Sequence, residues 1–244
     1  MPATESSARN SPRAGRRRKG QIRLNNEESI LRAAEEIFAL AGFAGARTAD
    51  IAAKAGIPKA NLHYYFRSKR ALYRAVLDNI LHLWLSETDI LRPDVEPRAA
   101  IEHYVRAKMS FSRRYPNASK VFANEVIHGA NEIGPFLKAE LRDLVRARAA
   151  VFDQWIQSGR MAPIDPTHLF FAIWAVTQTY ADFEAQVRAV LGVAEVSDDQ
   201  FQRATEEVVA LILRGCGFFF LPPGGDADAP AASPVKARRL ARPR

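Results

Sequence analysis

The apolar positions of the chain recur three and four residues apart through most of its length. Ile30, Leu31, Ala34 and Phe38 show the spacing of one helix face. From Pro97 onward the same spacing continues without the two-residue alternation that is typical of strands. The pattern predicts an all-α fold of about nine helices. We expect them at 26–42, 48–55, 59–66, 69–91, 97–114, 116–128, 135–158, 165–191 and 197–215.

Two short helices joined by a glycine turn stand out between residues 48 and 69. Thr48 is a good N-cap residue for the first helix, and Gly56 can adopt the positive φ that a chain reversal needs. Pro58 suits the first turn of the second helix, where its missing N–H would have no partner in any case. The small side chains of Ala52 and Ala55 let the two helices approach closely. This order is the helix-turn-helix pattern, which predicts a DNA-reading unit.

The helix expected over 69–91 is too long to serve the helix-turn-helix alone, so it should connect that unit to the rest of the chain. We expect a three-helix DNA-binding domain over 25–78 and a helical ligand-binding and dimerisation domain over 79–221. The ends, 1–24 and 222–244, lack apolar periodicity, so we expect a disordered basic arm and a disordered tail.

The helix expected over 165–191 is apolar on two faces, which predicts burial on two sides. One side can face the domain's own core and the other a second copy of the chain. The helix over 197–215 can complete that contact, so that two helices from each subunit form a homodimer interface. The residues expected there are Val176, Tyr180, Phe183, Val187, Phe201, Val208 and Ile212.

The net charge of +8 is unevenly distributed. Residues 1–24 carry +6 and residues 222–244 carry +3, whereas residues 25–221 carry −1. Within that nearly neutral middle, the stretch 47–74 holds seven basic residues against one acid, Asp50. Positive charge is therefore concentrated in the tails and around the helix-turn-helix, as phosphate binding requires. A sequence-independent, architectural DNA binder driven by the tails is the alternative reading.

Several functional classes are disfavoured. The single Cys216 cannot form an intrachain disulfide, and the N-terminus has no apolar signal region, so we expect a cytoplasmic protein. The longest dense apolar run, 169–176, is too short to span a bilayer, so no membrane is expected. The histidines do not show metal-ligand spacing, and no catalytic constellation is recognisable, so we expect no metal, no catalytic residue and no enzyme.

The stretch ILRAAEEIFALAGFAGARTADIAAKAGIPKANLHYYFRSKRALYRAV resembles the TetR-type transcriptional regulators, strongly over about residues 25–80. The resemblance implies an all-α homodimer that binds double-stranded DNA at a palindromic operator and releases it, as a repressor, when a small molecule binds. It also implies a recognition helix in the major groove. The residues expected to contact DNA are Arg47, Thr48, Lys59, Ala60, Asn61, His63, Tyr64 and Lys69. His63 stands where the family commonly has tyrosine, which leaves the operator sequence open.

The segments LDNILHLWL, YVRAKMSFSRRYPNASKVFANEVIHGA and SGRMAPIDPTHLFFAIWAVTQTYADFEAQV are similar to the pyrimidine-utilisation (Rut) branch of that family. The branch implies a uracil- or thymine-like effector and no cofactor. Indole rings can sandwich a flat heterocycle, and a glutamine amide can pair with its O=C–N–H edge. The expected ligand-binding residues are Trp84, Phe122, Glu125, Trp174 and Gln178.

Two alternatives remain for this site. The tryptophans can be core residues, with Gln178 bonded to a neighbour such as Glu125, or the effector can be an unrelated small molecule.

Overall fold

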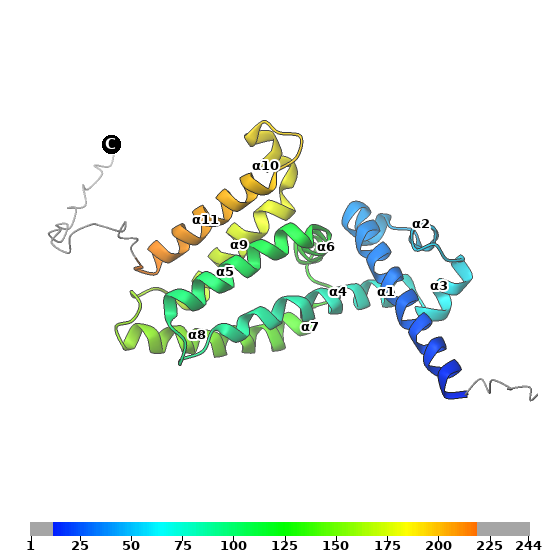
Figure 1. Cartoon of the computed structure of the whole chain (residues 1–244), viewed down its shortest axis with the longest axis horizontal. Coiled ribbons are helices and arrows are strands. Elements are labelled where there is room, and N and C mark those ends of the chain that lie inside the picture. The colour runs from blue at the N-terminus through cyan, green and yellow to red at the C-terminus, as the bar shows by residue number, and fades with distance from the viewer. Residues whose placement is uncertain (1–11, 219–244) are drawn as a thin grey trace, which may run out of the picture.

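The computed structural model describes the backbone of residues 12–218, and every element in that range is helical, which confirms the all-α prediction (Figure 1). An N-terminal unit holds α1 (Pro12–Gly45), α2 (Thr48–Lys54), α3 (Lys59–Tyr65) and the start of α4 (Lys69–Leu85). A C-terminal body follows. It holds η1 (Ser86–Ile90), α5 (Pro97–Arg114), α6 (Pro116–Ile127), α7 (Gly134–Phe136), η2 (Leu137–Leu141), α8 (Arg142–Gln157), α9 (Pro166–Asp182), α10 (Glu184–Leu191) and α11 (Asp198–Gly215).

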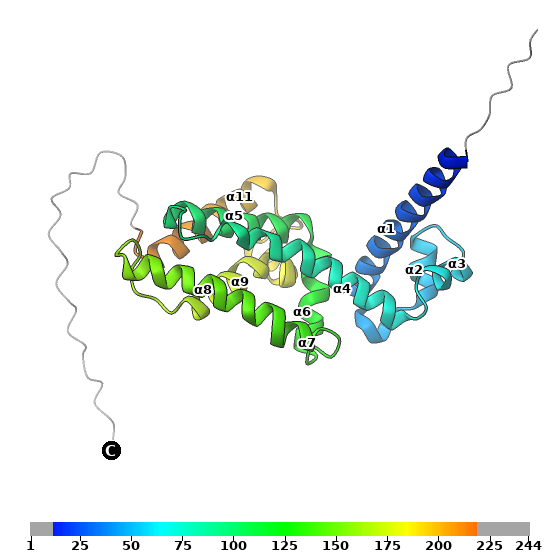
Figure 2. The ribbon, with the colours of Figure 1, turned by 90° about the horizontal axis from the view of Figure 1, so that it is seen from below.

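Helix α4 joins the two parts without interruption, and two perpendicular views show it running from the N-terminal unit into the body (Figure 1, Figure 2). Ser68 begins it, because its Oγ accepts a hydrogen bond from the N–H of Ala71 at 3.1 Å. The helix expected over 69–91 is an α-helix only to Leu85 and then tightens into the 3₁₀ helix η1.

The first helix begins much earlier than the expected start at Asn26. Residues 12–24, which we expected to be part of a disordered arm, are helical and extend α1 back to Pro12. That expectation relied on missing apolar periodicity, but arginine, lysine and alanine are good helix formers and proline suits a first turn. Gly42 interrupts α1, as predicted, with φ of 66° and ψ of 175°. Residues 1–11 and the tail predicted over 222–244 lie outside the described residues.

The helix expected over 165–191 is two helices, α9 and α10. Phe183 leaves the helical conformation, with φ of −113° and ψ of 32°, so the chain changes direction there. Apolar spacing alone could not reveal this break, because Phe183 fits the periodic pattern on both sides.

The described part of the chain has two hydrophobic cores. The first joins α1 to α4 and includes Ala118 and Val121 of α6, so α6 belongs to the body but also packs beneath the N-terminal unit. The second lies within the body, around Tyr104, Phe152 and Trp155. Because α4 and α6 both cross from one part to the other, a shift of either helix in the body reaches the N-terminal unit.

Candidate functional site

Helix α3 presents a polar surface that its buried residues hold in place. Leu62 is 1% exposed and anchors the helix to the core. The Tyr65 hydroxyl accepts a hydrogen bond from Nδ2 of Asn26 in α1 at 3.1 Å. The residues that face outward form what we call the α3 surface, namely Lys59, Ala60, Asn61, His63 and Tyr64. This surface is a fixed helix face rich in hydrogen-bonding groups, as base-edge readout in a major groove requires.

The turn between α2 and α3 depends on Gly56. Its φ of 68° lies in the left-handed region. The next N–H, that of Ile57, donates to the carbonyl of Ala52 at 3.0 Å. A side chain at position 56 would strain this conformation, which would misalign α3 relative to α2.

Two of the residues predicted to contact DNA, Arg47 and Thr48, lie at the start of α2. Thr48 is the first residue of that helix rather than its cap, because Arg47 takes the extended conformation of the preceding position. Lys69 does more than the sequence predicts: its Nζ donates to the carbonyls of Ala44 and Ala46 at 3.3 and 3.0 Å. It thus fastens the α1–α2 connection beside Arg47 and Thr48.

In the C-terminal body, four of the five predicted ligand residues line one cavity of about 60 Å³. They are Trp84, Phe122, Trp174 and Gln178. The indole of Trp84 meets the ring of Phe122 edge-on, with centroids 4.8 Å apart. Further lining residues are Leu81, Leu85, Thr88, Tyr104, Lys108, Leu141 and Leu144. We call this space the tryptophan cavity; it is mostly apolar with few polar groups, as a site for a small planar molecule would be.

Some polar groups of the tryptophan cavity have hydrogen-bond partners and others do not. Trp174 Nε1 donates to the Tyr104 hydroxyl at 2.9 Å. Burial raises the pKa of Tyr104 to about 12, so its own O–H remains a donor at neutral pH. In contrast, the Trp84 indole N–H is buried without an acceptor, and Gln178 has no hydrogen-bond partner among the described residues. The predicted alternative of a bond between Gln178 and Glu125 is therefore not observed.

Lys108 is the functional candidate that the sequence analysis missed. It lies on α5, is 4% exposed, and its Nζ lies 4.3 Å from the centre of the Trp84 ring. Burial lowers the pKa of Lys108 to about 8, while the carboxylate of Asp182 opposes that shift. The sequence signal that could have revealed it is a lysine between Val105 and Met109, on the apolar face of α5.

Glu125, the fifth predicted ligand residue, does not line the tryptophan cavity. It lies one turn beyond Phe122 on α6, beside Tyr73 of α4. Its carboxylate accepts the N–H of Glu132 at 2.6 Å. Burial and this carboxylate together raise the pKa of Tyr73 in α4.

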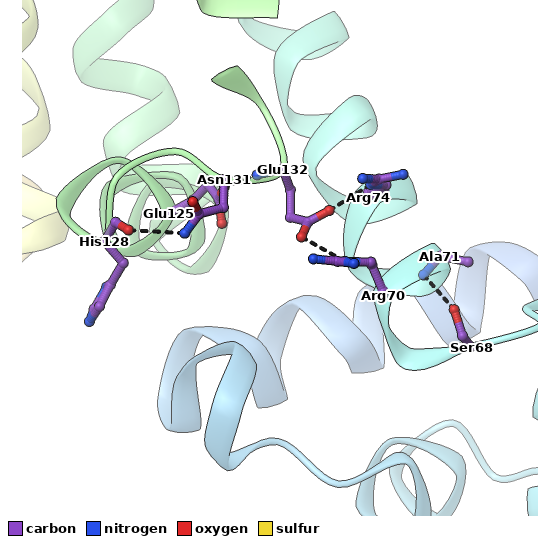
Figure 3. Close-up of polar contacts among 8 residues, drawn as sticks. All are labelled: Ser68, Arg70, Ala71, Arg74, Glu125, His128, Asn131 and Glu132. Atoms are coloured by element: carbon purple, nitrogen blue, oxygen red, sulfur yellow. Dashed lines mark hydrogen bonds and ion pairs between the residues drawn. The ribbon is translucent and has the colours of Figure 1, made fainter. Parts of the chain in front are cut away.

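Glu132 ties the loop after α6 to α4. Its two carboxylate oxygens lie 2.8 Å from Nε of Arg70 and 2.6 Å from Nε of Arg74 (Figure 3). The same loop is braced by Asn131, whose Nδ2 donates to the carbonyl of His128 at 3.2 Å. We call Glu132, Arg70 and Arg74 the glutamate clamp. It is a direct polar link between the body and the N-terminal unit.

The predicted dimer residues differ in how deeply they are buried. Ile212 and Val208, 6% and 7% exposed, pack into the body's own core, so they contribute little accessible surface. Tyr180 and Phe201 are half-buried against each other, with ring centroids 5.7 Å apart. Val176, Tyr180, Val187 and Val208 line an apolar groove of about 710 Å³ between α9, α10 and α11. The sequence analysis missed three exposed apolar residues of this groove, Val190, Leu191 and Leu211.

Phe183 is 55% exposed at the break between α9 and α10, beside that groove. Within residues 12–218, no group of histidine, cysteine and acidic side chains is arranged to hold a metal ion. No helix in the same range is both long and apolar enough to cross a membrane.

Comparison with known protein families gives two adjoining matches. Residues 30–76 match the model described as bacterial regulatory proteins, tetR family, and residues 77–218 match that of the YcdC-like protein, C-terminal region. Together the two models extend over the N-terminal unit and the C-terminal body.

Among characterised proteins, the chain is 44% identical to the HTH-type transcriptional regulator RutR of Escherichia coli (strain K12) over 189 residues, which are 78% of this chain and 89% of that protein. Solved structures share the fold at lower identity. The ketosteroid transcriptional regulator KstR2 of Mycobacterium tuberculosis aligns with a TM-score of 0.64 at 18% identity, over 78% of this chain and 93% of that one. AibR in complex with isovaleryl coenzyme A and operator DNA aligns with a TM-score of 0.60 at 18% identity, over 76% and 97%.

Proposed function

Since the chain belongs to the TetR family of transcriptional regulators, we propose that it is a repressor whose operator DNA is released when a uracil- or thymine-like pyrimidine enters the tryptophan cavity. Family membership confirms the resemblance noted in the sequence. The observation that carries the effector proposal is the meeting of Trp84, Trp174 and Gln178 around one small cavity. Flat rings and one amide are suited to a planar heterocycle with an O=C–N–H edge.

The DNA side of the proposal rests on the α3 surface. Lys59, Asn61 and Tyr64 supply groups for base edges, while Thr48 and Lys69 are the proposed phosphate contacts. We place the DNA-binding domain at 25–78 and the ligand-binding and dimerisation domain at 79–221, with the boundary inside α4. A protein that binds operator DNA works in the compartment that holds the DNA, so we assign it to the cytoplasm.

The unit that binds DNA is a homodimer in this proposal. The apolar groove between α9, α10 and α11 faces outward, and a second copy related by a two-fold axis would cover it. Two α3 surfaces would then read two half-sites of a palindromic operator.

Release of DNA requires that the effector bind one shape of the dimer more tightly than the other. Each tenfold difference in that affinity corresponds to about 1.4 kcal/mol. Helix α4 is the lever, because Trp84 in the tryptophan cavity and the clamped Arg70 and Arg74 belong to the same continuous helix. An effector that moves Trp84 would therefore move the attachment of α3.

The test is a gel-shift titration of Trp174→Ala on an operator selected from genomic fragments. We expect the variant to bind the operator as the unaltered protein does and to lose release by uracil, because only the cavity has changed. Phe111→Ala is the matched control, an aromatic residue of the same body that does not line the cavity. A normal uracil response of Trp174→Ala would place the effector elsewhere.

A further inference from the structure

Lys108 brings a charged group to the wall of the tryptophan cavity. Its side chain is almost fully buried, yet no carboxylate or carbonyl hydrogen-bonds its ammonium group within the described part of the chain. The face of the Trp84 ring lies 4.3 Å from Nζ, and the Asp182 carboxylate supplies opposite charge nearby without a hydrogen bond to it. An ammonium has three donors, and a ring face offers no lone pair to them. A buried charge in this condition is costly unless an acceptor completes its surroundings.

Most of the polar groups that line the cavity are hydrogen-bond donors. Lys108 offers N–H groups, the Tyr104 hydroxyl has its proton free because its oxygen already accepts from Trp174, and the Trp84 N–H lacks an acceptor. The Gln178 amide offers one acceptor oxygen and two further N–H donors. A molecule that complements this set must bring more acceptors than donors.

We propose that Lys108 determines the effector class by donating a hydrogen bond to a ring carbonyl oxygen, so that the site takes a planar dicarbonyl heterocycle and rejects ring analogues with an amino group at that position. This inference rests on the proposed function and adds to it the residue that sets specificity. An amino group would bring an N–H against the ammonium and leave both donors unpaired, which is the strongest form of discrimination that a buried polar site can exert.

The cavity also favours a neutral acceptor over a carboxylate. A space of about 60 Å³ is small, and the Asp182 carboxylate already supplies negative charge near Lys108. A second carboxylate would bring extra volume and repulsion from Asp182, whereas a carbonyl oxygen adds only the missing lone pair.

The experiment combines a change in the protein with a change in the ligand. Binding of uracil, pyrimidin-2-one, pyrimidin-4-one and cytosine to the full chain would be measured by titration calorimetry at pH 7. Each pyrimidinone keeps one of the two uracil oxygens, so the pair reports which oxygen Lys108 contacts. The variant is Lys108→Met, which keeps the length and most of the volume of the side chain. Lys120→Met is the matched control, since Lys120 lies on the adjoining α6 and pairs with Glu184 at 2.8 Å.

We expect Lys108→Met to weaken uracil binding about 10- to 100-fold, the value of a charge-assisted hydrogen bond, and to narrow the preference for uracil over cytosine. The loss should recur with one pyrimidinone and vanish with the other, because a coupling exists only where both partners are present. Lys120→Met should bind as the unaltered protein does.

Three outcomes separate the possible failures. If the unaltered protein binds none of the pyrimidines, the proposed effector is wrong and this inference falls with it. If it binds uracil and Lys108→Met binds equally well, only the role of Lys108 is overturned. If Lys108→Met fails to fold, the unaltered protein still decides, because equal affinity for uracil and cytosine would contradict selection by a carbonyl acceptor.

Discussion

The α3 surface and the tryptophan cavity differ in how their polar groups are satisfied. Asn61 is exposed, so water can satisfy its side-chain amide when DNA is absent. In the cavity, Lys108 and the Trp84 N–H are withdrawn from water and lack partners. An exposed group adds to binding affinity only when a ligand contacts it. An unsatisfied buried group also lowers the affinity for every ligand that fails to pair with it. The cavity is therefore the more selective of the two surfaces for each hydrogen bond it makes.

The largest expected effect is on the free energy of unfolding and involves neither the α3 surface nor the tryptophan cavity. Phe152 is 0% exposed and its ring packs edge-on against Trp155 and Phe170 in the body's core. Phe152→Ala should lower the free energy of unfolding by about 3–5 kcal/mol, because it leaves a cavity that the surroundings fill only partly. Urea denaturation measures this loss. A loss below about 1 kcal/mol would mean that this core collapses around the change, and the tryptophan cavity would then be less rigid than we infer.

The second-largest effect should appear only in the affinity for DNA. Asn61→Ala is expected to weaken operator binding by about 1–3 kcal/mol, the value of a base-edge contact, and to leave the affinity for uracil unchanged. Stability should change by less than about 0.5 kcal/mol, because the side chain is exposed. Fluorescence anisotropy with operator and with unrelated DNA makes the measurement. An equal loss on both DNAs would show that Asn61 contacts phosphate and not a base.

The smallest effect concerns the link between the two regions. Burial raises the pKa of Glu132, but Arg74 and Arg70 outweigh it and hold the net pKa below the usual glutamate value. The clamp therefore contributes stability above the ordinary glutamate pKa and loses it as pH falls through the lower folded value. That contribution should be below about 1 kcal/mol, because both arginines are largely exposed.

Glu132→Gln should flatten the acid side of the stability profile, which thermal unfolding as a function of pH records. Glu140→Gln is the control, an exposed glutamate in the helical segment that follows the same loop. An unchanged acid limb in Glu132→Gln, or an equal change in the control, would contradict the role of the clamp.

Local pattern predicted α2, α3 and the turn at Gly56, because these features depend on neighbouring residues, but it misjudged the start of α1 and the cap of α2. The tryptophan cavity is assembled from helices far apart in the chain. Its aromatic members were found through family resemblance, and Lys108 was overlooked because a lysine is ordinarily assigned to a solvated face. Glu125 lies outside the cavity because its carboxylate is held by the N–H of Glu132, a contact with a following loop that helical spacing does not reveal. The break at Phe183 was invisible because both halves keep the same apolar spacing.

The unbroken course of α4 sets a rule for anyone who wishes to exchange the sensing body of this protein for another. Residues of an α-helix are separated by about 100° around its axis, so one inserted residue between Arg74 and Trp84 would turn the cavity end by that angle relative to α3. Three or four residues would nearly restore the phase, at the cost of about 5 Å in length. Chimeric regulators joined within α4 should therefore respond to their effector in a periodic manner as the junction is lengthened, and the period should be that of the helix.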